Sequence, residues 1–113
     1  MPYTNLDYLN TVTDGDSFLM KEMINLFISQ IDEFTRNFHK FLEEKNWDAL
    51  GKEAHKAKSS VLILGMNDLG RKLKDLQLNI ENKEAVETYS DYITDFEFQT
   101  KEAIKELETI GQD

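Results

Sequence analysis

Apolar residues recur at spacings of three and four along nearly the whole chain, and no other sequence feature limits the possible folds so strongly. The clearest run comprises Trp47, Leu50, Ala54, Ala57, Val61 and Leu64. Such spacing places apolar side chains on one face of a helix, whereas the alternation typical of strands is weak throughout. The sequence therefore predicts an all-α protein in which each helix buries one stripe.

Turn and cap signals separate the first two helices. A short amphipathic segment over residues 6–12 ends at the turn formed by residues 14–16. Asp16 or Ser17 has the short polar side chain that suits an N-cap. The helix that follows carries an apolar stripe that opens at Phe18 and runs to about Glu44.

Three further helices follow. Asn46 suits the N-cap of a third helix, Gly65 suits the position after its end, and Asn67 or Asp68 suits the N-cap of a fourth. A fifth pattern covers residues 86–110. Four long amphipathic helices with short connections predict an antiparallel up-down-up-down four-helix bundle with a short additional N-terminal helix.

Length and composition narrow the class of protein. The 113 residues suit one domain, 1–113, which we expect to be monomeric. The absence of cysteine excludes disulfides and cysteine zinc sites and fits the cytoplasm, where we place the chain. No window approaches the length of apolar sequence that spans a bilayer, so we expect no membrane association. A net charge of -9 argues against nucleic acid as a partner.

One segment departs from this acidic character. Residues 51–74 hold six basic side chains and two acidic ones, a local charge of +4, so the rest of the chain carries -13. A basic segment of this kind can attract an anion even when the whole protein is acidic.

His55 lies within the basic segment and, at 100° per residue, about 130° from a core face centred near Val61. We therefore expect it to be exposed. Gly51 precedes it and Ser59 follows it by one helical turn, with Leu62 beyond, so small side chains would let a docking protein approach the imidazole. For Gly51, helix packing is the alternative explanation.

A neutral imidazole is a nucleophile that can attack phosphorus, and Lys58, one turn on, could offset the charge of a bound phosphoryl group. The alternative for a surface histidine is that it has no function, and we keep that interpretation for His39. Lys52 and Arg36 stand where a di-iron bundle needs glutamate three residues before each histidine, so metal ligation is disfavoured.

The segment 55–60, followed by Gly65, resembles the histidine phosphotransfer (HPt) domain of multistep phosphorelays, and the resemblance extends to segments 14–23 and 46–50. It implies that His55 takes a phosphoryl group from the aspartate of one response-regulator receiver domain and passes it to another. It also implies a hybrid sensor kinase among the partners, no kinase activity, and no cofactor of the chain's own, since the receiver supplies Mg²⁺. Lys58 matches the charge-balancing lysine of the family. Ser59 departs from the usual glycine.

Two other functions stay open. The chain could be an HPt-like docking or adaptor domain that binds receivers or other partners without carrying phosphate, although an intact nucleophile argues against this. It could also be a metal-binding bundle. If the phosphotransfer hypothesis holds, Leu62 would belong to an apolar docking patch beside the histidine, together with exposed residues of the long second helix.

Overall fold

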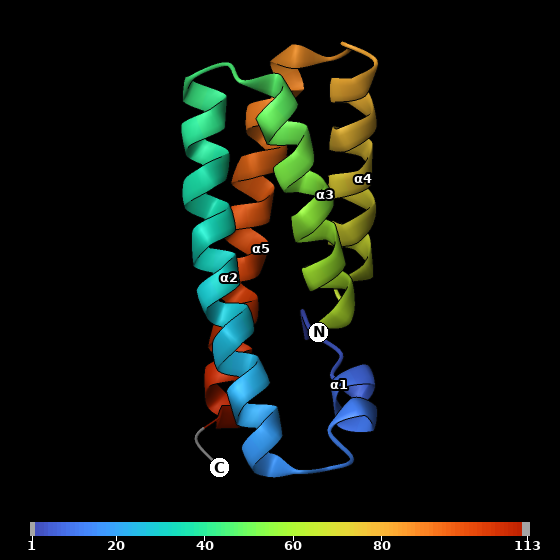
Figure 1. Cartoon of the computed structure of the whole chain (residues 1–113), viewed down its shortest axis with the longest axis vertical. Coiled ribbons are helices and arrows are strands. Elements are labelled where there is room, and N and C mark those ends of the chain that lie inside the picture. Colours follow the sequence, from blue (N-terminus) through green and yellow to red (C-terminus); the bar gives the residue numbers. More distant parts are fainter. Residues whose placement is uncertain (1, 112–113) are drawn as a thin grey trace.

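The computed structural model of the protein describes residues 2–111 and the side chains of residues 2–109, so the side chain predicted for position 110 lies outside it. Regular structure in that part is helical throughout, which confirms the all-α class. The helices are α1 (Asp7–Val12), α2 (Ser17–Glu43), α3 (Trp47–Ile63), α4 (Asn67–Glu81), the 3₁₀ helix η1 (Val86–Thr88) and α5 (Tyr89–Gly111) (Figure 1). In the described residues, none of these helices has both the length and the apolar character needed to cross a bilayer.

The start of α2 is fixed by Asp16, as the sequence predicts. Its carboxylate accepts hydrogen bonds from the backbone amides of Phe18 at 2.9 Å and Leu19 at 3.0 Å, which satisfies two donors of the first turn. Phe18 itself is 68% exposed, so the expectation that it opens the buried stripe is wrong. The first turn of α2 lies beyond the ends of α3 and α4 (Figure 1).

Local signals also set the ends of α3. The side chain of Asn46 accepts a hydrogen bond from the amide of Ala49 at 3.3 Å, and Gly65 follows the helix with a φ of +77°. Both predicted roles are confirmed. The N-cap of α4 is instead Met66, which makes no side-chain capping bond. The prediction that α4 is capped by its own first residues is therefore wrong, because those residues are already helical.

Two polar pairs align α2 with α3. Asn37 donates to the carboxylate of Glu53 at 2.6 Å, and Ser60 donates to the side-chain oxygen of Gln30 at 3.3 Å. The later residue on α2 meets the earlier one on α3, so the two helices run in opposite directions. Glu53 and Ser60 are both buried, and these bonds supply partners that buried polar groups need.

Two glycines bring α3 and α4 close together. A Cβ on Gly51 of α3 would lie 3.2 Å from Cγ2 of Ile80 on α4, and a Cβ on Gly70 of α4 would lie 2.5 Å from Cδ2 of Leu62 on α3. Each helix thus presents a bare backbone to an aliphatic side chain of the other. These contacts also show that α3 and α4 are antiparallel.

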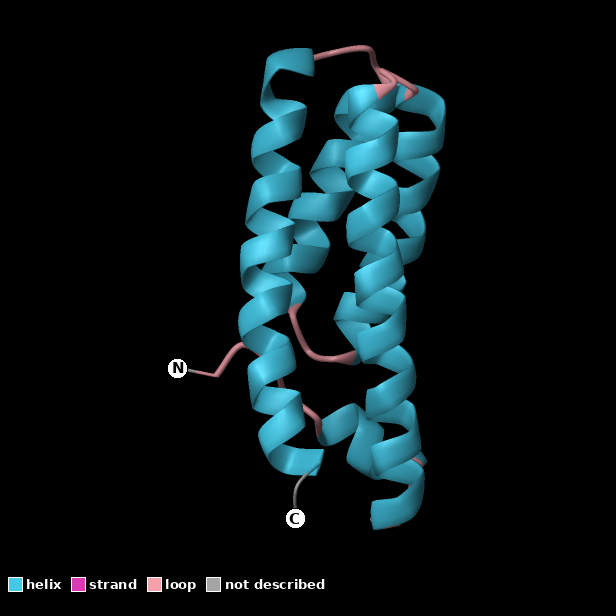
Figure 2. Ribbon diagram, turned by 90° about the vertical axis from the view of Figure 1, so that its left-hand side faces the viewer, coloured by secondary structure: helices cyan, strands magenta, loops and turns pink. Residues whose placement is uncertain are grey.

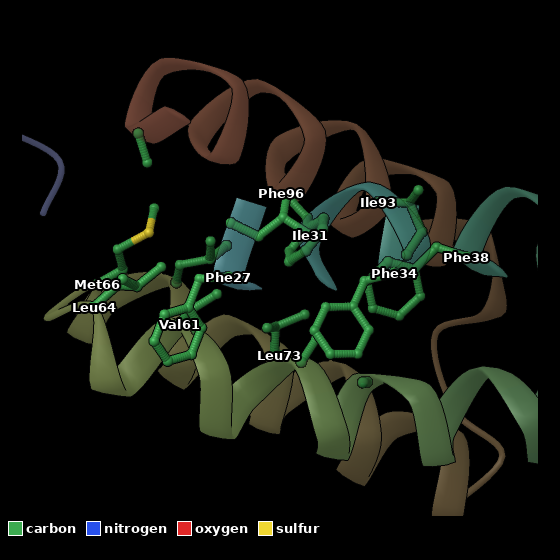
Figure 3. Close-up of a cluster of buried hydrophobic side chains, with 14 of the residues drawn as sticks. Phe27, Ile31, Phe34, Phe38, Val61, Leu64, Met66, Leu73, Ile93 and Phe96 are labelled. Carbon is green, nitrogen blue, oxygen red and sulfur yellow. The ribbon is translucent and has the colours of Figure 1, made fainter. Parts of the chain in front are cut away.

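The core fills the space between the four long helices (Figure 3). Phe38 of α2 and Phe96 of α5 meet edge to face with ring centroids 5.0 Å apart, a favourable aromatic geometry. Lys72 of α4 pairs with Asp95 of α5 at 2.9 Å. Two differences from the sequence prediction appear where α5 begins: residues 86–88 form η1 rather than the first turn of α5, and Val86 is 45% exposed.

The N-terminal segment closes the end of the molecule at which α3 passes into α4 (Figures 1 and 2). The backbone amide of Asn5 donates to the carbonyl oxygen of Leu64 at 2.9 Å. Glu106 of α5 accepts hydrogen bonds from the amides of Tyr3 at 2.6 Å and Thr4 at 3.1 Å. The short helix α1 that follows is anchored by one fully buried leucine at position 9.

Candidate functional site

His55 lies near the middle of α3 on an exposed face, as the helical spacing predicts. Its Nδ1 atom is 3.3 Å from Oε1 of Gln77 on α4. The amide nitrogen of Gln77 donates in turn to Oε1 of Glu81 at 3.0 Å. The imidazole is therefore held from one side by α4, and among the described residues its Nε2 atom has no hydrogen-bond partner.

The pair of His55 and Gln77 lies between the two glycine contacts that join α3 and α4. The same antiparallel register connects position 51 with 80, 55 with 77, and 62 with 70. Because the glycines let the backbones approach, a side chain as short as glutamine reaches the ring. The close packing of the two helices thus positions the imidazole.

Ion pairing distinguishes the three lysines of α3. Lys52 pairs with Asp48 at 3.0 Å, and Lys56 lies 3.8 Å from Glu53, so a carboxylate already offsets each charge. Lys58, one turn after the histidine, is half-buried and forms no ion pair with any residue that the structure describes. Its ammonium is the α3 cation most available to a bound anion.

Gly51 does not give an approaching protein open space. It is buried, and Ile80 of α4 occupies the position next to its missing side chain. This corrects the expectation that Gly51 clears the surface for docking. Helix packing, the alternative weighed for this residue, accounts for the glycine.

The other two predicted docking residues do reach the surface. Ser59 is exposed, and its hydroxyl has no hydrogen-bond partner among the described residues. Leu62 is 43% exposed and leans over Gly70 toward α4. The exposed surface around His55 therefore extends along α3 through both positions, while their role in docking stays a prediction.

A groove of about 920 Å³ opens beside the imidazole. Its residues come from α3, the end of α4, η1 and the start of α5, and the apolar ones are Trp47, Ile80, Val86 and Tyr89. His55, Gln77 and Glu81 line it as well. The histidine thus borders an apolar hollow, which the helical spacing alone does not predict.

Tyr89 is a structural part of this groove. Its ring is fully buried and meets Trp47 edge to face at 5.3 Å, while its hydroxyl approaches two backbone carbonyl oxygens, that of Glu84 at 2.8 Å and that of Asn79 at 3.2 Å. Burial raises the pKa of the phenol, and the charges of Glu87 and Glu84 raise it further. At neutral pH the phenol stays protonated and holds the end of α4 against α5.

His39, the second histidine, has a different environment. Its Nε2 atom lies 3.0 Å from the carboxylate of Glu97, so it links α2 to α5. This contact gives the residue a structural explanation. Across the described residues, no three His, Cys, Asp or Glu side chains gather in a way that could hold a metal ion.

Gln77 and Glu81 were not predicted as part of the site. The signal that would have found Gln77 is the short turn at Gly65: once α3 and α4 are taken as antiparallel neighbours, positions equally far from the turn face each other, which places 77 opposite 55. Glu81 then follows as the residue one turn beyond Gln77 on the same helix. An amide at the position facing a candidate nucleophile would then have been noticed.

Comparison with known proteins finds a curated relative that resembles part of the chain. The chain is 27% identical over 67 residues to the phosphorelay intermediate protein YPD1 of Candida albicans. The match covers 59% of this chain and 36% of that protein, so it spans little more than a third of the relative's length. No protein-family profile matches the chain, and no solved structure matches it significantly.

Proposed function

We propose that this protein is a phosphorelay intermediate that carries a phosphoryl group on Nε2 of His55. The observation that carries the proposal is the state of the imidazole: Nδ1 is engaged by Gln77, Nε2 has no partner among the described residues, and the unpaired Lys58 lies one turn away. The similarity to a phosphorelay intermediate supports it. In this proposal, α2–α5 form the up-down-up-down bundle of an HPt domain.

The proposed reaction is a balanced transfer between two nucleophiles. The lone pair of Nε2 attacks the phosphorus of an aspartyl phosphate on a receiver domain, an N–P bond forms, and the P–O bond to the aspartate breaks. The aspartate leaves as a carboxylate with the electron pair. The ring keeps its proton on Nδ1, and that N–H donates to Gln77. The reverse sequence passes the group to a second receiver.

The chain's part in this reaction is to position a nucleophile and a cation. Lys58 would offset the negative charge of the phosphoryl oxygens as a mobile point charge. Mg²⁺ would belong to the receiver, whose own acidic residues hold it. Response-regulator receivers and a hybrid sensor kinase are the partners in this proposal, with the chain as a monomer.

The test is transfer of radiolabelled phosphate from a phosphorylated receiver domain. The chain should acquire label that is lost in acid and retained in base, as a phosphoramidate is. His55→Gln should abolish labelling, whereas His39→Gln, at the histidine already bound to Glu97, should not. Labelling of the His55→Gln variant would refute the proposal. Receiver binding with no labelling of the unmodified chain would favour the docking-domain alternative.

Docking gives a second test, at Leu62. If this side chain contacts the receiver, Leu62→Glu should slow transfer by roughly tenfold or more, because a carboxylate would be buried at the interface. Leu78→Glu is a matched control: Leu78 is 42% exposed and lies on α4, whereas Leu62 is 43% exposed. Equal transfer rates for the two variants would show that Leu62 takes no part in docking.

A further inference from the structure

The contacts of His55 form a chain of three side chains that ends at Glu81. Nδ1 of the imidazole lies 3.3 Å from Oε1 of Gln77, and Nε2 of Gln77 lies 3.0 Å from Oε1 of Glu81. Gln77 and Glu81 are one turn apart on α4, so they share a face of that helix. In this series of hydrogen bonds, each side chain determines whether the next one donates or accepts.

The direction of each hydrogen bond follows from which groups can donate. A carboxylate only accepts hydrogen bonds, whereas a glutamine amide has a donor end and an acceptor end. Glu81 therefore requires the NH₂ group of Gln77, which turns the carbonyl oxygen of Gln77 toward the imidazole. A ring nitrogen that faces a carbonyl oxygen must carry hydrogen, so the proton of the neutral ring lies on Nδ1 of His55.

We propose that Glu81 is a positioning residue that selects the tautomer of His55 through Gln77. The inference rests on the proposed phosphoryl transfer for its functional meaning. With the proton on Nδ1, the lone pair of Nε2 points away from α4 and is free to attack phosphorus. With the amide of Gln77 reversed, its NH₂ group would donate to Nδ1, the proton would move to Nε2, and that nitrogen could not attack.

The same orientation suits the phosphorylated ring. Once Nε2 is bonded to phosphorus, Nδ1 carries hydrogen and positive charge, and it needs an acceptor beside it. The carbonyl of Gln77 is already in that position and needs no rearrangement. An unrestrained histidine side chain in water prefers the proton on Nε2, so the role of Glu81 is to reverse that preference before the receiver arrives.

The tautomer can be observed directly by long-range ¹H–¹⁵N NMR on the ¹⁵N-labelled chain, at a pH where the ring is neutral. The unmodified protein should show His55 protonated on Nδ1. Glu81→Lys should shift it toward protonation on Nε2, because a lysine donates to the carbonyl of Gln77 and reverses the amide. Glu81→Gln should give a mixture of tautomers, since the new amide can accept from Gln77 or donate to it and so no longer fixes its orientation.

Two further variants make the result interpretable. Glu81→Met removes the acceptor without adding a donor and should give a mixture of tautomers. Asp75→Lys makes the same change of charge as Glu81→Lys at another exposed position of α4, and it should leave the spectrum of His55 unchanged. A lysine at position 81 is compatible with the fold, because this last residue of α4 lies at the negative end of the helix dipole.

The rate of labelling by a phosphorylated receiver should follow the tautomer, falling roughly twofold to tenfold in Glu81→Lys, the range expected for one hydrogen bond. An unchanged tautomer in Glu81→Lys, or an equal shift in Asp75→Lys, would overturn the inference while leaving the proposed function intact. If the tautomer shifts as expected but His55 accepts no phosphate in any variant, the positioning role stands and the proposed function fails.

Discussion

At the scale of single residues, the lysines of α3 share a helix but differ in their partners. Lys52 and Lys56 are neutralised by carboxylates of their own helix, whereas Lys58 is not paired within the described chain. A phosphoryl group on the neighbouring histidine would therefore meet one uncompensated positive charge.

Lys58→Ala should slow phosphoryl transfer by about fivefold, because a solvent-screened attraction of about 1 kcal/mol between a cation and the transferring group would be lost. The measurement is the initial rate of labelling by a phosphorylated receiver. Lys52→Ala is the matched control, since its charge is already offset by Asp48. Comparable losses for both variants would mean that net charge, rather than the position of Lys58, governs the rate.

Tyr89 gives a prediction about stability and pH. Its pKa is raised above 10.0 in the folded chain, chiefly by burial. As pH rises through 10, the unfolded chain loses this proton first, so the free energy of unfolding should fall until the folded pKa is reached. Tyr89→Phe has no phenol to ionise, so its free energy of unfolding should fall less at alkaline pH. At neutral pH the variant should be about 1 kcal/mol less stable, because the hydrogen bonds of the hydroxyl are lost.

The check is urea unfolding of both proteins at about pH 7 and pH 10.5. Tyr8→Phe controls for the removal of a hydroxyl, because Tyr8 is 58% exposed. If Tyr89→Phe and the unmodified chain lose the same stability between the two pH values, Tyr89 does not contribute to the alkaline transition.

At the scale of helices and their connections, the turn between α3 and α4 combines two constraints at Gly65. Its φ of +77° is unfavourable for residues with a side chain, and a Cβ there would lie 2.5 Å from the carbonyl oxygen of Asn5. Gly15 separates these effects, because it has a φ of +75° but a Cβ added to it would meet no atom within 4 Å.

Gly15→Ala should therefore destabilise the fold by about 1 kcal/mol, the conformational cost alone. Gly65→Ala should cost clearly more, because the N-terminal segment must also move. Thermal or urea unfolding of the two variants measures the difference. Equal losses of stability in the two variants would indicate that moving the N-terminal segment costs no free energy.

Much of the element order could be predicted because its signals are local. Asp16 and Asn46 act on amides two or three residues away, and Gly65 acts through its own backbone. The exposure of Phe18 could not be predicted in this way, since it depends on where the neighbouring helices end. The start of α5 was misplaced for a related reason: its first residue, Tyr89, is buried against Trp47 of α3, and a local pattern does not reveal that contact.

The same distinction between signals within one helix and contacts between helices applies to the candidate site. The exposure of His55 followed from periodicity within one helix, but its partner Gln77 belongs to another helix. Finding it requires the register between α3 and α4, which the contact of Gly51 with Ile80 and that of Gly70 with Leu62 establish. Gly51 was assigned to docking because a single helix gives no information about what covers it.

At the scale of the whole molecule, Glu106 ties the first residues of the chain to the last helix. Its carboxylate holds the amides of Tyr3 and Thr4, and the hydroxyl of Thr4 donates to it as well at 3.0 Å. The segment that leads into α1 is therefore attached to α5 at one side and to the α3–α4 turn at the other.

Glu106→Ala should free this segment while leaving the bundle folded. We expect amide hydrogen exchange at Tyr3 and Thr4 to accelerate by roughly tenfold, because bonds to a charged acceptor are lost, with little change at core amides of α3. Glu108→Ala removes an exposed carboxylate from the same helix and is the control. Unchanged exchange at residues 3 and 4 in Glu106→Ala would show that other contacts hold the segment.

The groove beside the imidazole also contains a natural optical reporter. Trp47 is the single tryptophan of the chain, it is half-buried, and its ring lies against Tyr89 in the lining of that groove. Tryptophan emission responds to the polarity of its surroundings. Fluorescence of the unlabelled protein therefore observes events next to His55, and a receiver without tryptophan could be titrated and followed in real time.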